Sequence, residues 1–143
     1  MLIREMTIVD HEALIRLLHE TPGVSVREAD SLEATARYLE RNPGLSFVAT
    51  DGADLVGCIM SGHDGRRGYL QHLAVRSEYR RQGIGAALVQ ACLDALLERG
   101  IAKTHLFVFT TNDTGNRFWQ NRGWAYRNDI NMYSFNRSSN DNV

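Results

Sequence analysis

The spacing of hydrophobic and polar positions predicts a chain in which strands and helices are mixed. Alternating or short continuous apolar segments, typical of strands, lie at residues 2–8, 46–50, 55–61, 69–75, 103–109 and 124–135. Apolar residues recur at helical spacing at 11–20, 31–41, 84–96 and 113–122. The order is strand, helix, helix, three strands, helix, strand, helix, strand, which predicts an α/β fold.

Breakers and capping residues set the ends of these segments. The clusters Thr21-Pro22-Gly23 and Asn42-Pro43-Gly44 end the first two helices, and Gly100 follows the third at the position where a left-handed residue is expected. With 143 residues the chain has the size of one domain. No repeat or linker divides it, so we expect one domain over 1–135 and a polar C-terminal tail over 136–143.

Composition and charge exclude several classes of protein. At 43% hydrophobic and 23% charged residues the chain is typical of a globular protein, not a disordered one. Its formal charge of −1, from 16 basic and 17 acidic residues, gives no global field that would attract nucleic acid or an anionic membrane. We therefore expect neither nucleic acid nor membrane as a partner.

Two cysteines indicate the redox compartment. Cys58 and Cys92 lie in apolar surroundings, with no CxxC and no histidine at ligand spacing, which favours buried thiols over a disulfide or a metal site. We expect no bound metal. No apolar run approaches the roughly 20 residues that span a bilayer, and the first residues are not typical of a signal peptide. The predicted location is cytoplasmic.

The segment 73–86 carries the most chemical information. A strand ends at Val75, an arginine-rich turn follows, and Gly83 and Gly85 open a long amphipathic helix. Helix N-termini expose unpaired N–H groups and bind phosphate, and glycines let an anion approach the backbone. From Arg66 to Arg81 there are five arginines against one glutamate, the strongest local excess in the chain.

Other interpretations of this segment exist. The same residues also fit a helix that begins with flexible glycines after a solvent-exposed basic turn and binds no ligand. Two familiar phosphate loops are excluded, because GxxxxGK[ST] is absent and Leu88 stands where GxGxxG requires its third glycine. The basic segment also allows a nucleic-acid-binding domain, although the net charge of −1 disfavours it.

Two motifs resemble those of the GNAT family of N-acetyltransferases. Arg80-Arg81-Gln82-Gly83-Ile84-Gly85 after Val75 resembles the family's acyl-CoA loop, [R/Q]xxGx[G/A]. Asn112, Asn116, Phe118-Trp119 and Arg122-Gly123-Trp124 resemble its later block, an Asn after the fifth strand, an aromatic pair and a Gly-aromatic step. The resemblance covers nearly the whole chain. It implies a single GNAT-like α/β domain whose mixed, mostly antiparallel central sheet is splayed between strands 4 and 5 and flanked by helices.

The resemblance implies where acetyl-CoA, the co-substrate, would lie. Backbone groups of Leu73 to Val75 would pair with pantetheine, and one N–H would polarise the thioester carbonyl. The loop Arg81 to Ala86 would cradle the pyrophosphate, while Asn112 and Asn116 would contact the pantetheine arm or hold the covering helix. The implied cofactor-binding residues are Leu73, Ala74, Val75, Arg80, Arg81, Gln82, Gly83, Ile84, Gly85, Ala86, Asn112, Asn116 and Trp119.

Two positions depart from the family pattern. Trp119 stands where many members place a tyrosine as general acid, and an indole cannot supply an acidic proton. Phe107 stands where acetylases of protein N-termini place a glutamate on the fifth strand. Both argue against membership of that subgroup.

A base is needed because an amine with a pKa near 10 is mostly protonated at neutral pH. His72, next to Leu73 on the central strand, is the leading candidate, and a structural histidine packed under a helix is the alternative. By strand alternation Gln71 is expected to point to the opposite face and to orient a water or the substrate. His63 and Asp64, in the preceding loop, are candidates for lining an acceptor pocket, with a turn role as the alternative. Tyr126 and Tyr133 are candidates for donating a proton to the leaving thiolate, with a core or rim position as the alternative. His105 is interpreted as structural, and His11 and His19, on a helix that in this family often borders the acceptor site, are interpreted as solvated.

The charged stretch Arg27-Glu28-Ala29-Asp30 is interpreted as a solvated face. The predicted function is acetyl-CoA-dependent N-acetylation of a primary amine, on a small molecule or an exposed protein amine, by direct attack in a ternary complex. The alternative is an acyl-CoA-binding regulatory module without turnover. Residues 10–41, where such a fold builds its acceptor site, carry no recognisable fingerprint, and analogy with related folds allows a homodimer.

Overall fold

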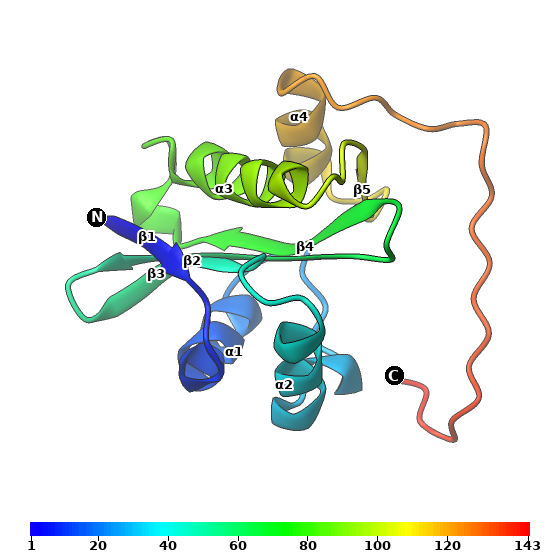
Figure 1. Ribbon diagram of the computed structural model, residues 1–143, viewed down its shortest axis with the longest axis horizontal. Helices are drawn as coiled ribbons and strands as arrows, with labels where there is room; N and C mark the ends of the chain where they lie inside the picture. Colours follow the sequence, from blue (N-terminus) through cyan, green and yellow to red (C-terminus); the bar gives the residue numbers. More distant parts are fainter. The chain divides into compact units, whose positions relative to one another are not determined.

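The computed structural model describes residues 1–143 and divides into two compact units, residues 1–107 and residues 108–143. The first unit contains a five-stranded sheet and three α-helices, and the second contains one α-helix. Figure 1 shows the path of the chain through the helices and strands of each unit.

The sheet of the first unit has the strand order β1-β2-β3-β4-β5. β1 to β4 pair antiparallel with their neighbours, and β5 pairs parallel with β4, which confirms the mixed, mostly antiparallel α/β sheet expected from the resemblance. The strands are β1 (Leu2–Glu5), β2 (Phe47–Asp51), β3 (Asp54–His63), β4 (Gly68–Val75) and β5 (Thr104–Leu106). The α-helices of this unit are α1 (His11–His19), α2 (Leu32–Arg41) and α3 (Ile84–Glu98).

Local chemistry explains the helix ends. The Ser31 hydroxyl accepts the N–H of Ala34 and so caps α2. At the other end of α3, Gly100 adopts φ +80°, and Ile101 and Gly100 donate their N–H groups to the carbonyls of Leu96 and Leu97. This is the Schellman arrangement that satisfies the last carbonyls of a helix, and it confirms the predicted role of Gly100.

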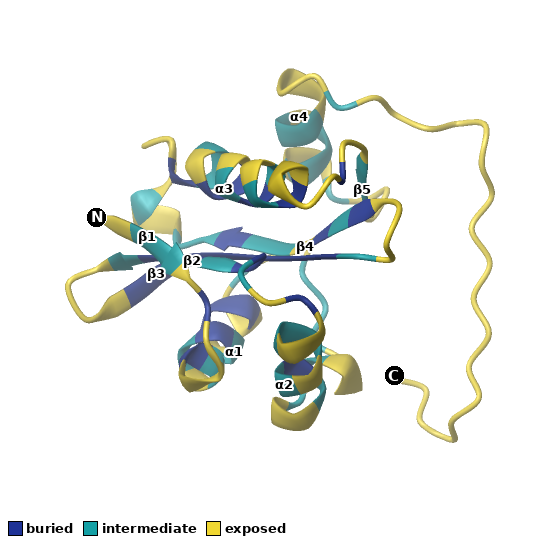
Figure 2. Cartoon of the chain, in the orientation of Figure 1, coloured by how far each residue is buried: buried dark blue, intermediate teal, exposed yellow.

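Helices cover both faces of the sheet. Helix α3 lies on one face, and α1 and α2 lie on the other (Figure 1). Gly57 lets α3 approach closely, since a Cβ there would lie 3.2 Å from Leu88. Figure 2 shows the buried residues gathered on the strands and on the helix surfaces that face them. The core under α1 and α2 includes Met6, Leu14, Leu17, Leu18, Val48, Cys58, Met60 and Ala74.

Strand β4 contains a β-bulge at His72. Met60 pairs with Gln71 and Cys58 with Ala74, so His72 and Leu73 of β4 lie opposite the single residue Ile59 of β3. His72 has a left-handed φ of 54°, a conformation uncommon for residues other than glycine. The bulge shifts the alternation of side chains along β4, which decides the direction in which His72 points.

The pairing of β4 with β5 ends early. Its register runs only from Gly68 opposite Thr104 to Leu70 opposite Leu106. From Gln71 to Val75, the β4 edge that faces β5 has no strand partner. The sheet therefore opens between strands 4 and 5, and the predicted strand 103–109 is shorter than expected.

The second unit is built around α4 (Asp113–Asn121). The Asn112 side chain accepts the N–H of Gly115 and caps the helix, as one of the two predicted capping residues. Residues 124–135 contain no strand, so the predicted last strand is wrong. A residue pattern indicates only that a segment can adopt an extended backbone. A strand also needs a neighbouring strand as its hydrogen-bond partner, and residues 108–143 contain none.

The two cysteines are free and buried, as predicted. Burial raises the pKa of each thiol to about 12. The reactive thiolate is therefore roughly a thousandfold rarer at pH 8 than for an ordinary thiol. We expect Ellman's reagent at pH 8 to label neither Cys58 nor Cys92 until guanidinium unfolds the chain. One equivalent of rapid labelling in the native protein would contradict the described burial.

None of the helices combines the length and the apolar content that a membrane-spanning helix requires.

Candidate active site

The turn between β4 and α3 has an unusual backbone. After Val75 the chain makes a short 3-10 turn, Ser77–Tyr79, and then passes through left-handed conformations at Arg81, with φ 62°, and Gly83, with φ 79°. A Cβ at Gly83 would meet nothing within 4 Å, so a glycine is favoured here by the positive φ and not by a lack of space. Gly83 is also the N-cap of α3, and no side chain caps this helix.

The helix start leaves a run of amides without acceptors. The N–H of Arg80 bonds to the Ser77 carbonyl, and the N–H of Ala87 bonds to the Gly83 carbonyl. Between them, the amides of residues 81–86 donate no hydrogen bond within the protein. We call residues 81–86 the amide loop. Such donors at the positive end of a helix form a site for an anion.

Arginines surround the amide loop. Arg80 and Arg81 are exposed, and the Arg80 Nε donates to the Val75 carbonyl at 3.1 Å. The guanidinium of Arg80 is thereby held at the end of β4. The loop thus combines free amides with fixed positive charge, which suits a diphosphate.

The unpaired β4 edge begins next to this loop. The Arg76 N–H bonds to the Val56 carbonyl on β3 at 2.8 Å, and Ala74 pairs with Cys58. Because amide direction alternates along an antiparallel strand, the N–H groups of Leu73 and Val75 face the other edge, which β5 leaves unpaired. The backbone of Leu73–Val75 is available there to an extended ligand.

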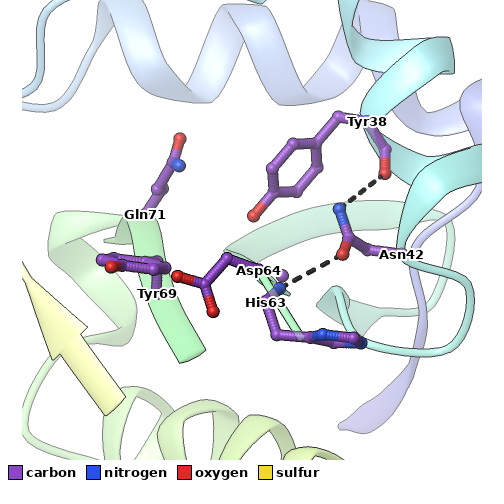
Figure 3. Close-up of a pocket in the computed structure, with 7 residues that line it drawn as sticks. Tyr38, Asn42, His63, Asp64, Tyr69 and Gln71 are labelled. Carbon is purple, nitrogen blue, oxygen red and sulfur yellow. Dashed lines mark hydrogen bonds between the residues drawn. The ribbon is translucent and has the colours of Figure 1, made fainter. Parts of the chain in front are cut away.

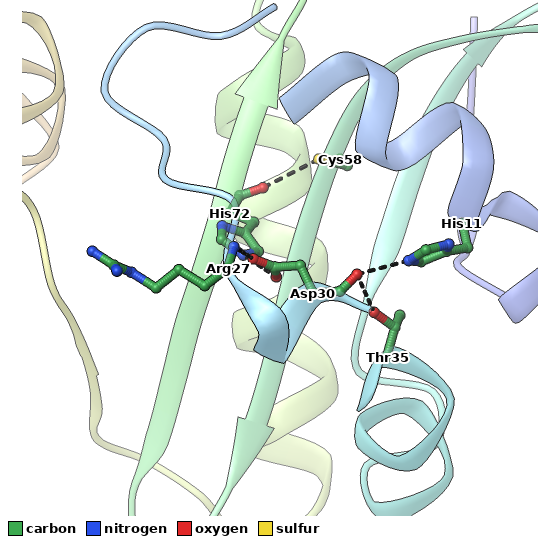
Figure 4. A network of polar contacts seen from close by, with 6 residues as sticks. All are labelled: His11, Arg27, Asp30, Thr35, Cys58 and His72. Carbon is green, nitrogen blue, oxygen red and sulfur yellow. Dashed lines mark hydrogen bonds and ion pairs between the residues drawn. The ribbon is translucent and has the colours of Figure 1, made fainter. Parts of the chain in front are cut away.

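His72 is held by a carboxylate. Its Nε2 lies 2.6 Å from the Asp30 Oδ1, and the two side chains are 18% and 12% exposed (Figure 4). The other Asp30 oxygen accepts the Arg27 N–H at 2.9 Å, and His11 lies 2.8 Å from the Asp30 carbonyl. Asp30 therefore anchors His72 between β4 and the helices on that face.

The protonation of this pair follows from its contacts. Burial raises the pKa of Asp30, but hydrogen bonds from His72 and the Arg27 N–H outweigh burial and hold this pKa below its usual range. Asp30 is then ionised at neutral pH and can only accept, so the His72 Nε2 must donate. A neutral His72 accordingly carries its lone pair on Nδ1, which makes no hydrogen bond within the protein.

Three expectations about this face are wrong. Asp30 is not part of a solvated face, because a carboxylate and a histidine 42 residues apart meet across the fold. His11 is not solvated, since it bonds to the Asp30 carbonyl. Gln71 does not point away from His72: both side chains lie on the side of the sheet that α1 and α2 cover, because the bulge breaks the alternation.

A cavity of about 170 Å³ lies beside Gln71 on the same face. We call it the α2 cavity, and its lining residues are Tyr38, Asn42, Gly62, His63, Asp64, Tyr69 and Gln71 (Figure 3). Asn42 is buried and fixed, since its amide donates to the Tyr38 carbonyl and accepts the His63 N–H. Sequence analysis named His63 and Asp64 as candidates for an acceptor pocket but did not find Tyr38, whose spacing is that of any helical residue.

The remaining candidates have structural contacts. His105 and Phe107 pack on the ring of Tyr69, with centroid distances of 5.9 and 6.4 Å. His19 is exposed, as expected. In the second unit, Asn116 donates to the carbonyls of Phe109 and Asn112. Trp119 packs edge-on against Phe118 and Trp124, with both centroids 5.0 Å away. Tyr126 and Tyr133 are exposed.

Known proteins resemble this chain in sequence and in fold. An acetyltransferase of Pectobacterium atrosepticum is 39% identical over 77 residues, which are 54% of this chain and 55% of that protein. The chain thus spans about half the length of the curated relatives that it matches. The crystal structure of Ard1 from Thermoplasma volcanium has a TM-score of 0.73 at 25% identity and covers 85% of this chain and 80% of that one.

A third similarity concerns a ligand-bound structure. PaiA N-acetyltransferase from Thermoplasma acidophilum, in complex with coenzyme A, has a TM-score of 0.74 at 24% identity, with coverage of 85% and 87%. The model of the Acetyltransferase (GNAT) family matches residues 11–124, which include α1, strands β2 to β5, the amide loop and α4. On this match, the chain belongs to the GNAT family of acetyltransferases.

Proposed function

We propose that this protein is an acetyl-CoA-dependent N-acetyltransferase that passes an acetyl group to a primary amine, on a small molecule or an exposed protein amine. The observation that carries the proposal is the amide loop, where the N–H groups of residues 81–86 have no acceptor at the N-terminus of α3. Such a row of donors has no acceptor within the fold, and together with the left-handed turn at Arg81 and Gly83 it fits a diphosphate group.

The residues present fit the co-substrate along its length. Amides of the amide loop would hold the pyrophosphate, with Arg80 and Arg81 adding charge. The outward-facing amides of Leu73 and Val75 would pair with the extended pantetheine arm. Contacts of the same ligand with Asn112, Asn116 and Trp119 remain predictions. When bound, acetyl-CoA supplies an acetyl group that its thioester activates for transfer.

His72 is the proposed general base. Its Nδ1 carries the lone pair in the neutral form, because Nε2 donates to Asp30. Nδ1 can therefore accept a proton from an ammonium group that approaches the β4 edge. Asp30 does not touch the substrate and acts as a positioning residue: it fixes the tautomer and the ring, and stabilises the imidazolium that forms. The resulting amine would attack the thioester carbonyl directly in a ternary complex, so that a C–N bond forms, the C–S bond breaks and coenzyme A leaves as a thiolate. A thiol of pKa near 8.5 leaves readily, and the thiolate takes its proton from water or from the His72 imidazolium.

The comparisons support this activity. Curated relatives are named acetyltransferases, and a solved neighbour holds coenzyme A. Transfer of that activity to this chain is part of the proposal, because the chain matches about half of the curated relatives. A cytoplasmic location and a homodimer belong to the proposal as well. The buried free thiols favour a reducing compartment.

A calorimetric titration with acetyl-CoA tests the co-substrate site. We expect binding at micromolar concentration, and weaker binding of dephospho-CoA if the 3′-phosphate also contacts the protein. Absence of binding at millimolar acetyl-CoA would contradict the proposal.

The second candidate is an acyl-CoA-binding module without turnover. It is favoured by Trp119 and by Phe107, which replace the tyrosine and glutamate of other family members, and Phe107 is exposed. Thiol release from acetyl-CoA, measured with a panel of primary amines, separates the two. Amine-dependent release identifies an enzyme, and tight binding without release identifies the module.

A further inference from the structure

The α2 cavity gathers polar groups that have no partner. The Tyr38 hydroxyl is buried and makes no hydrogen bond. The Tyr69 hydroxyl and the Gln71 amide also make none within the protein. Figure 3 shows Tyr38 and Asp64 turned toward the space that Tyr69 and Gln71 border. A buried hydroxyl without a protein partner is costly in a folded protein unless a water or a ligand completes its hydrogen bond, so the α2 cavity offers a place where a polar group of a ligand can bind.

The cavity carries a negative charge. Asp64 is an exposed residue at the rim of the cavity. Hydrogen bonds from the Arg67 and Arg66 N–H groups, together with the positive charge of Arg66, lower the pKa of Asp64, so its carboxylate is ionised at neutral pH. Both N–H groups bond to Oδ1, which leaves Oδ2 free. Arg66 and Arg67 follow Asp64 in the loop, but neither lines the cavity. The lining therefore offers one carboxylate, two phenolic oxygens, the Gln71 amide, the Asn42 amide that is already paired within the protein, and the His63 imidazole, whose Nδ1 accepts the Gly65 N–H; it contains no lysine or arginine.

An ammonium group matches this set of oxygens. It carries three donors and no acceptor, and a primary amine enters the site in this form at neutral pH. The ring of Tyr69 is held in place by His105 and Phe107, so this side of the cavity is preformed. At about 170 Å³ the cavity is smaller than pockets that enclose whole drug-sized ligands, and it holds one end of a molecule.

The cavity lies away from the site of transfer. Gln71 borders it, whereas the unpaired edge proposed for the thioester lies at Leu73 to Val75. These positions are two to four residues further along β4, about 7 to 13 Å at the rise of a strand. A group bound in the cavity is therefore not the reacting nitrogen, and His72 lies between the two places.

We infer that the α2 cavity binds a second ammonium group of the acceptor, so that the acceptor is an aliphatic diamine or polyamine. This inference rests on the proposed acetyltransferase function. Tyr38, Asp64 and Gln71 receive the distal ammonium, and the methylene chain runs along β4 past His72. The near amino group then loses its proton to His72 at the β4 edge.

The test compares acceptors of equal length with one or two amino groups. Diamines from 1,4-diaminobutane to 1,10-diaminodecane are assayed against the n-alkylamines of the same carbon number by release of the coenzyme A thiol. We expect kcat/KM for the best diamine to exceed that of its monoamine by about tenfold or more, because a charged hydrogen bond is gained. Asp64→Asn keeps an oxygen for the Arg66 and Arg67 amides but loses the charge, and should bring this ratio close to one.

Two further variants sharpen the comparison. Tyr38→Phe removes only the unpaired hydroxyl and should lower the ratio severalfold. Asp54→Asn removes the same charge from the opposite end of β3, where Asp54 is exposed, and should leave the ratio unchanged. Calorimetric titration of the diamine into the protein without acetyl-CoA gives a readout that does not depend on turnover, and Asp64→Asn should abolish that binding.

The outcomes separate this inference from the proposed function. If acetyl-CoA binds and amines release its thiol, but diamines and monoamines react equally, the diamine site is excluded and the acetyltransferase remains. If no amine releases thiol while the diamine binds the free protein through Asp64, the proposed function fails and the cavity remains a diamine site. If neither binding nor preference is seen, the α2 cavity does not take an ammonium group.

Discussion

Gly85→Glu is expected to remove acetyl-CoA binding, with a loss of affinity of at least about a hundredfold. Gly85 is the second residue of α3, and its N–H belongs to the amide loop. A glutamate there brings a carboxylate to the place proposed for the pyrophosphate. Affinity is lost because the carboxylate repels the phosphates and because the phosphates no longer form charge-assisted hydrogen bonds with the amides, each worth about 1.5–3 kcal/mol. Calorimetric titration of the variant with acetyl-CoA measures it.

The substitution should leave the fold intact. A negative side chain in the first turn of a helix interacts favourably with the macrodipole, so α3 is not weakened at this end. Leu97→Glu serves as the matched control, since Leu97 is exposed near the other end of α3 and the change in net charge is the same. We expect Leu97→Glu to bind acetyl-CoA like the wild type. Wild-type affinity in Gly85→Glu would exclude the amide loop as the phosphate site.

The amide loop was predictable because its signal is local. Gly83 and Gly85 stand at a change from strand to helical periodicity, and a helix start exposes donors wherever it lies in a fold. The same holds for the caps at Ser31 and Gly100, where a side chain or a left-handed residue acts on neighbours within a few positions.

The contacts of His72 were not predictable from its neighbours. Asp30 lies 42 residues earlier in a stretch whose charges look like those of any solvated helix start. The bulge that turns His72 toward Asp30 also has no local signature, because the segment 69–75 reads as a regular strand. Tyr38 has helical spacing and an apolar ring, so only the fold distinguishes its unpaired hydroxyl from an ordinary packed tyrosine.

The error at residues 124–135 has a different cause. Tyr126, Ile130, Met132 and Phe135, set among polar residues, give the segment the aromatic and apolar content of a strand, yet these side chains are exposed. The residue pattern indicates that a segment prefers an extended backbone, whereas a strand is stabilised by hydrogen bonds to a neighbouring strand. The sequence of the segment therefore carries no information on whether such a neighbour is present.

His72→Ala is expected to lower kcat by about 100- to 1000-fold, the contribution of a positioned general base. The affinity for acetyl-CoA should change little, because the amide loop and the outward amides of β4 are backbone groups. The pH profile should change as well. A general base makes kcat/KM fall when the solution becomes acidic enough to protonate it, and this acidic limb should be lost in the variant. Asp30 itself is not the source of this limb, because hydrogen bonds from His72 and the Arg27 N–H outweigh burial and lower the pKa of Asp30, which keeps its carboxylate ionised.

Asp30→Asn separates a positioning role from a structural one. An asparagine can donate to the His72 Nε2, which moves the imidazole proton to Nδ1 and removes the lone pair that the mechanism needs. We expect kcat to fall at least about tenfold, and the double variant with His72→Ala to be no slower than His72→Ala alone, because two residues acting as a unit are not additive. Asp10→Asn is the matched control: it weakens another paired carboxylate, 2.8 Å from Arg4, and should alter stability without altering the pH profile. Additive losses in kcat, or an acidic limb that survives His72→Ala, would assign the proton to a different acceptor and leave the Asp30–His72 pair a structural role at the bulge.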